Sequence, residues 1–128
     1  MTLKFIDVEL ALQELLREQG YNAMLYVPDD PGEQLVWIVK TGGTRSGVFD
    51  RATVQINVIG DSRTRCQETS EEIFNFLLSD SHWVETEDVT GLIDRVYGEG
   101  STPLELDLGD QYKHYSFNAA VETRAIPN

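Results

Sequence analysis

A strictly alternating segment, Arg51 to Ile59, constrains the fold of this chain more than any other feature. Its alternate positions form an apolar set (Ala52, Val54, Ile56 and Val58) and a polar set (Arg51, Thr53, Gln55 and Asn57). Because successive side chains of a β-strand point to opposite faces, this pattern predicts a strand with one buried and one solvent-facing side. The chain is therefore expected to build a sheet with one covered face.

Two segments have the apolar spacing of amphipathic helices. The first begins near Asp7, repeats an apolar residue every three or four positions, and stops at Gly20. The second follows the alternating strand over about Ser62 to Leu78, and Asp61 is favoured over Ser62 as its cap because it comes directly after the strand. The first half of this helix is almost entirely polar, so its second half is expected to make the stronger contact with the sheet.

Further strands are expected at 23–27, 34–40, 92–98 and 112–124, with a connection at 79–91. Strands and helices do not alternate regularly, which predicts an α+β fold with a mostly antiparallel sheet and two main helices packed on one face. Long loops are expected at 41–50 and 98–111, and loops of this length are usually functional. A chain of 128 residues fits a single domain, 1–128.

The charge is strongly negative and unevenly distributed. A net charge of −12 opposes free binding to a nucleic-acid backbone. Five of the ten basic residues lie within 40–65, whereas 68–110 contains twelve acids and only Arg95 against them. Either two solvated faces differ by chance, or the subunit has a basic and an acidic side suited to head-to-tail contact and ring closure. No apolar run is long enough to span a bilayer, so we expect a soluble protein made in a cytoplasm.

No motif supports catalysis, so we expect neither enzymatic activity nor a cofactor or metal ion. "GGTRSG" lacks the ending of a phosphate-binding Walker A loop and precedes a strand. His82 and His114 have no ligand spacing, and His114 is expected at the surface or at an interface because it lies on the polar face of its strand. Cys66 lies near Arg63 and Arg65, as a reactive thiol would, but its apolar helix face favours a small buried residue.

The series of elements resembles the tail terminator (tail completion) proteins of long-tailed bacteriophages, particularly those of actinobacterial hosts. The similar parts are the "LALQELL" helix, the "LVWIVKTGG" strand, the segment "FDRATVQINVIGDSRTRCQETSEEIFNFLLS" and the close "GLIDRVYGEGSTPLELDLGDQYKHYSFNAAVETR". The most telling features are the step Asp50-Arg51 into the alternating strand, the helix with a polar first half, and Tyr115 and Phe117 after an acidic, proline-containing loop. The resemblance extends from about Val8 to Thr123.

This resemblance implies a structural virion protein with an α+β fold and without catalytic residues. Such a protein forms a hexameric ring at the head-proximal end of the tail tube, ends tube polymerisation and joins tail to head. The expected partners are further copies of the chain, tail tube protein and head–tail connector proteins, and DNA passes through without specific binding. Assembly is expected in the host cytoplasm.

Charge and exposure, rather than the family, suggest which residues make these contacts. The candidate interface residues are Arg45, Phe49, Arg51, Trp83, Glu99, Glu105, Asp107 and Asp110. The 41–50 loop supplies the basic side of a subunit contact, and the 98–111 loop the acidic side. Acids that face a channel repel phosphate, and the candidates for this role are Glu68, Glu71 and Glu72.

Two alternative functions fit the same sequence. A head-completion or head–tail connector protein would also be small, acidic and ring-forming, and would differ in its ring partner. A monomeric acidic binding or inhibitor protein belongs to another class and would remain a monomer at all concentrations.

Overall fold

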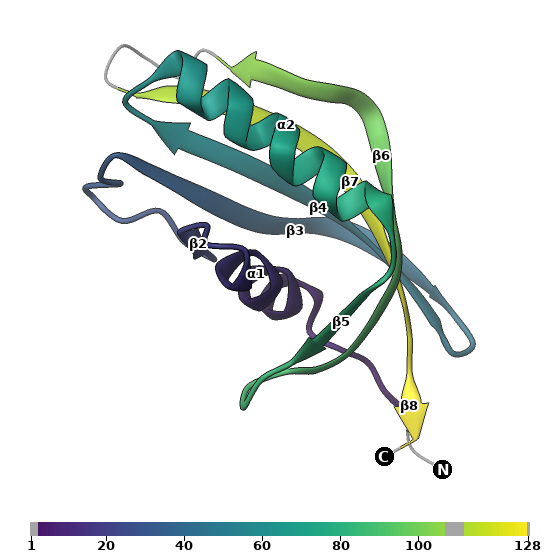
Figure 1. The fold of residues 1–128 in the computed structure, drawn as a ribbon. Coiled ribbons are helices and arrows are strands. Elements are labelled where there is room, and N and C mark those ends of the chain that lie inside the picture. Colours follow the sequence, from purple (N-terminus) through teal and green to yellow (C-terminus); the bar gives the residue numbers. More distant parts are fainter. Residues whose placement is uncertain (1–2, 107–111, 128) are drawn as a thin grey trace.

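The computed structural model describes residues 3–106 and 112–127 (Figure 1). In chain order the elements are β1 (Leu3–Lys4), α1 (Val8–Glu18), β2 (Ala23–Met24), β3 (Gln34–Ser46), β4 (Phe49–Gly60), α2 (Arg63–Ser79), β5 (His82–Glu85), β6 (Thr90–Leu106), β7 (Lys113–Arg124) and β8 (Ile126–Pro127). None of the described helices is long and apolar enough to cross a membrane.

Six strands form one curled sheet in the order β2-β3-β4-β7-β6-β5, and β1 pairs with β8 in a separate two-stranded ribbon. Every pairing is antiparallel except that of β2 with β3. Strands dominate and two helices accompany them, so the prediction of an α+β protein built on a mostly antiparallel sheet is confirmed.

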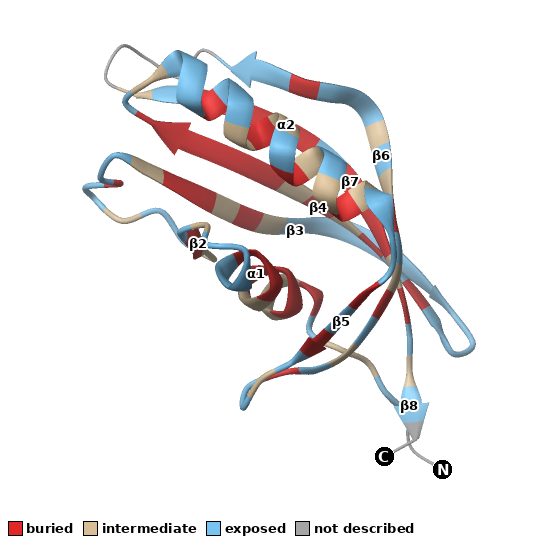
Figure 2. Cartoon of the chain, viewed as in Figure 1, coloured by how far each residue is buried: buried red, intermediate tan, exposed pale blue. Residues whose placement is uncertain are grey.

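Both helices cover the same face of the sheet, and the core lies between the helices and that face (Figure 2). The alternating strand is β4, and its apolar set is buried on this face as predicted. Leu12 and Leu16 of α1 are fully enclosed, and the Phe74 ring of α2 meets the Phe117 ring of β7 edge-on at 5.1 Å. The buried residues of α2 include Cys66 as well as those of its second half, so the helix contacts the sheet along its whole length.

The ends of α1 agree with the prediction from sequence, whereas the N-terminal cap of α2 differs from it. Asp7 caps α1, and Gly20 follows its end with a φ of +93°. The cap of α2 is Ser62, whose side chain accepts a hydrogen bond from the Arg65 amide at 3.3 Å. The preference for Asp61 was wrong, because the Asp61 amide still bonds to the Glu33 carbonyl and continues the strand geometry.

The predicted loop at 41–50 is instead a β-hairpin. β3 and β4 pair as far as Ser46 and Phe49, which leaves only a two-residue turn. Residues 41–46 are exposed, so backbone pairing holds them in the strand without an apolar pattern. Gly43 is required here, because its φ is +149° and an added Cβ would lie 2.8 Å from the Arg51 carbonyl oxygen.

Two other predicted connections also contain strands. β6 continues to Leu106, through an irregular stretch between Glu99 and Leu104, so the first part of the predicted loop at 98–111 was wrong. Its remainder, 107–111, lies outside the described residues. The predicted connection at 79–91 contains β5, whose alternating burial was hidden by its shortness and by flanking acids.

Candidate docking surface

A row of exposed side chains crosses four neighbouring strands on the helix-free face. Phe49 of β4 lies opposite Arg124 of β7, and Leu92 of β6 lies opposite Trp83 of β5. The pairing of Thr123 with Ile93 joins these two pairs into one row. Phe49, Leu92 and Trp83 are 55%, 40% and 57% exposed, whereas the residues that follow them in the chain, Asp50, Ile93 and Val84, are buried on the opposite face. We call these three residues, two aromatic and one aliphatic, the aromatic row.

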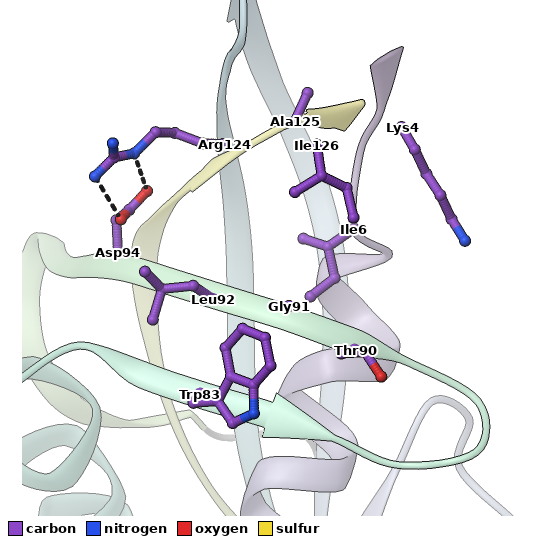
Figure 3. A pocket seen from close by; sticks show the side chains of 10 residues that line it. All are labelled: Lys4, Ile6, Trp83, Thr90, Gly91, Leu92, Asp94, Arg124, Ala125 and Ile126. Carbon is purple, nitrogen blue, oxygen red and sulfur yellow. Dashed lines mark hydrogen bonds and ion pairs between the residues drawn. The ribbon is translucent and has the colours of Figure 1, made fainter. Parts of the chain in front are cut away.

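An open pocket of about 360 Å³ adjoins the aromatic row. Figure 3 shows its apolar lining, to which Ile6, Trp83, Leu92 and Ile126 contribute, and its polar rim of Lys4, Asp94 and Arg124. Strand alternation places Trp83, Leu92 and Arg124 on one surface, and Ile6 and the β1–β8 ribbon add the wall formed by the chain ends.

A glycine allows the N-terminal segment to close one side of the pocket. A Cβ on Gly91 would lie 2.7 Å from Ile6 Cδ1, so the Ile6 side chain packs directly on the β6 backbone. On the other side, the Trp83 indole N–H donates to Glu85 Oε2 at 3.2 Å. The pocket walls are therefore positioned by contacts within the chain.

A two-bond ion pair fixes the polar side of the pocket. Arg124 Nε donates to Asp94 Oδ2 and Arg124 Nη2 donates to Asp94 Oδ1, both at 3.1 Å. The hydrogen bond to Asp94, with the attraction of its charge, raises the pKa of Arg124 above its ordinary value. This forked geometry orients the guanidinium while leaving much of it in solvent.

The structure brings together two of the residues predicted from sequence. Phe49 and Trp83 belong to the same aromatic row, although they are far apart in the chain. Their neighbours Leu92 and Arg124 were missed, because the only sequence signal was the large apolar side chain of Trp83 in a segment predicted to be a connection. Without the β5–β6 hairpin, no cross-strand partner of Trp83 could be named.

The predicted basic residues already have partners within the chain. Arg45 Nε lies 3.0 Å from Asp50 Oδ1, and its guanidinium stacks over the Phe5 ring at 4.0 Å. Arg51 Nη2 lies 3.5 Å from Glu99 Oε1. This contact places Arg51 and Glu99 on one surface of one chain, which contradicts their assignment to opposing sides of a subunit.

The remaining acidic candidates differ in how far the structure defines them. Glu105 Oε2 accepts from Arg63 Nε at 2.8 Å, so this acid also has an internal partner. Asp107 and Asp110 lie outside the described residues. Their place in a subunit contact stays a prediction.

The three acids predicted to face a channel all lie on α2. Glu68 and Glu72 are exposed and Glu71 is half-buried. Glu72 Oε2 accepts from the Tyr21 hydroxyl at 3.1 Å. Burial, together with this bond, raises the pKa of Tyr21. Nothing in these contacts decides which surface faces a channel, so that assignment stays a prediction.

His114 is buried within the chain, so its expected position at the surface or at an interface was wrong. Its Nε2 lies 2.7 Å from Asn57 Oδ1, and Asn57 Nδ2 donates to the Trp37 carbonyl at 3.2 Å. Nδ1 has no hydrogen-bond partner among residues 3–106 and 112–127. Burial lowers the pKa of His114. The buried side chains of Asn57 and His114 are hydrogen-bond partners across two neighbouring strands. Their polar character in the sequence does not reveal this pairing.

Cys66 is buried as expected from its helix face. Burial raises the pKa of its thiol, and nearby Asp61 raises it further, which opposes thiolate formation. Within the described part of the chain, no group of three potential ligand side chains is placed to hold a metal ion.

Comparison with known proteins adds no relative to this description. The sequence matches no protein-family model, and no curated protein aligns with it significantly. Functional assignment therefore depends on the fold, on the aromatic row and its pocket, and on the resemblance in element order described above.

Proposed function

We propose that this chain is a ring-forming structural protein of a long-tailed bacteriophage. It lies at the head-proximal end of the tail tube, ends tube polymerisation and joins tail to head. The observation that carries the proposal is the aromatic row with its adjoining pocket. Exposed apolar side chains grouped on one surface of a strongly acidic protein are typical of a protein-docking site.

The sheet edges support assembly between copies. β2 and β5 are short, so most of the outer edges of β3 and β6 have no partner strand among the described residues. Unpaired strand edges offer backbone hydrogen bonds to a neighbouring chain. One backbone amide on the outer edge of β3 already has a partner within the chain, because Lys40 N–H donates to Glu9 Oε2 at 2.9 Å. A subunit of a ring needs two such sides, one for each neighbour.

The place in the virion depends on the resemblance to tail terminators and on the charge. The α+β fold with two helices on one face agrees with what that resemblance implies. A net charge of −12 suits a channel through which DNA slides without binding, since the protein repels phosphate.

The mass of the protein in solution tests this proposal. Light scattering after size exclusion is measured across protein concentration. The protein is measured alone and in mixtures with tail tube protein, portal protein or adaptor protein from the same genome. We expect a ring, or a monomer that becomes a ring on tube ends. A ring that ignores tubes and binds portal or adaptor protein would indicate the connector alternative. A monomer that ignores all three partners would favour an acidic binding protein and refute the proposal.

A further inference from the structure

A second exposed apolar feature lies in the segment that joins β2 to β3. Tyr26 and Val27 are 67% and 42% exposed, and we call these two residues the knob. The segment has a defined turn, because the Gly32 amide donates to Asp30 Oδ1 at 2.9 Å and Pro31 is buried. The knob is therefore presented by a shaped segment.

The knob and the pocket lie at opposite ends of the same sheet. Gln34, which follows the knob segment, is in register with Gly60 at one end of β4, whereas Phe49 pairs with Arg124 at the other end. β4 has 12 residues, which span roughly 40 Å at about 3.3 Å each. In Figure 1 the segment between β2 and β3 and strand β8 lie at opposite ends of the molecule. The knob of one chain cannot fill its own pocket.

The charges around the two features are complementary. Three acids, Asp29, Asp30 and Glu33, follow the knob within its segment. The pocket rim instead carries the cation of Lys4 beside the Arg124–Asp94 ion pair, so one positive charge is in excess there. Complementary charge orients an encounter between an apolar side chain and an apolar pocket.

We propose that the knob of one copy fills the pocket of the next copy. This contact deepens the ring proposal and rests on it. The tyrosine ring packs against the apolar wall beside the aromatic row, and the acids behind the knob face the basic rim. Because the two surfaces differ, the contact is head-to-tail, and repeating it around a rotation axis closes a ring. Large aromatic side chains in desolvated pockets commonly dominate such contacts.

Single variants test each half of the contact. Tyr26→Ala removes the aromatic ring of the knob, and Leu92→Asp places a charge in the pocket wall. Both sites are exposed, so the variants are expected to fold. Unchanged circular dichroism and thermal unfolding would confirm this. Each variant is expected to raise the protein concentration needed for association at least tenfold. Leu104→Asp is the matched control for Leu92→Asp, since Leu104 is also exposed on the helix-free face, opposite Ser116, but belongs to neither feature.

Mixing the two variants gives the sharper result. Tyr26→Ala keeps an intact pocket and Leu92→Asp keeps an intact knob, so one sound contact remains between unlike variants. Sedimentation velocity should show monomers for each variant alone and dimers, with nothing larger, for the mixture. Variants that form rings like the unchanged protein would overturn this contact and leave the ring proposal standing. An unchanged protein that is monomeric even with tube ends would overturn both.

Discussion

Replacing Thr123 with valine should stabilise this protein. Thr123 is 1% exposed on the covered face of β7, and its hydroxyl has no hydrogen-bond partner within the described residues. It lies opposite Asp50, whose Oδ2 also has no partner there. A buried polar group without a partner costs about 1–3 kcal/mol, and valine has the same shape without that group. Valine also suits a strand well.

We therefore expect Thr123→Val to raise the free energy of unfolding by about 1 kcal/mol, the low end of that range. For a chain of 128 residues this corresponds to roughly 4 °C in the thermal midpoint. Equilibrium urea unfolding followed by tryptophan fluorescence measures the change, and the slope with denaturant should stay constant.

Val121→Thr is the reciprocal control. Val121 is fully buried two residues earlier on the same strand and face, so the substitution adds a hydroxyl to an apolar site. It should lower the free energy of unfolding by about 1–3 kcal/mol. A loss of stability in Thr123→Val would refute the reasoning, because it would mean that the hydroxyl donates to Asp50 in solution.

Three further substitutions test other parts of the fold. The folded-state pKa of His114 is lowered, so the unfolded chain binds its proton more readily, and stability should fall as the pH drops below the ordinary histidine value of about 6.5. His114→Gln should flatten this dependence of the free energy of unfolding on pH between about pH 7 and 5.5, above the range where carboxylates titrate. An unaltered dependence would mean that His114 does not cause it. Gly43→Ala should lower the thermal midpoint clearly, because its φ is +149° and the facing backbone is 2.8 Å from the new Cβ, whereas Gly42→Ala meets nothing within 4 Å and should be nearly neutral. Equal effects would mean that the hairpin adjusts freely. Ser62→Ala should cost about 1 kcal/mol in urea unfolding, and Asp61→Ala less, since only Ser62 caps α2; the reverse order would restore Asp61 as the cap.

The elements that follow a side-chain pattern could be predicted from sequence. β4 alternates from Arg51 to Val58, and the apolar positions of that stretch, Ala52, Val54, Ile56 and Val58, are buried. In α1, the spacing of Leu12 and Leu16 predicts a helix face, and both side chains are fully enclosed. In these cases burial of one face decides both the local structure and the packing, so the pattern contains the necessary information.

Elements held by backbone pairing could not be predicted in this way. Residues 41–46 are exposed and include two glycines, yet they extend β3 because β4 supplies hydrogen-bond partners. The same holds for the end of β6. The candidate docking surface depends on these extensions, since Phe49 starts the return strand of one hairpin and Trp83 belongs to another. Sequence could select two exposed aromatic residues, but not their common row.

The charge asymmetry of the sequence acquires a different meaning in the folded chain. Arg51 on β4 and Arg63 at the start of α2, both from the basic stretch, pair with Glu99 and Glu105 of β6 from the acidic stretch. These pairs are largely exposed, and exposed pairs contribute little free energy. Opposite charges that are separated in sequence are therefore neighbours in space, and they reduce the charge difference between the two sides of a subunit. In the proposed head-to-tail contact, the apolar knob and pocket therefore supply most of the attraction, and the acids after the knob and the rim lysine orient the approach.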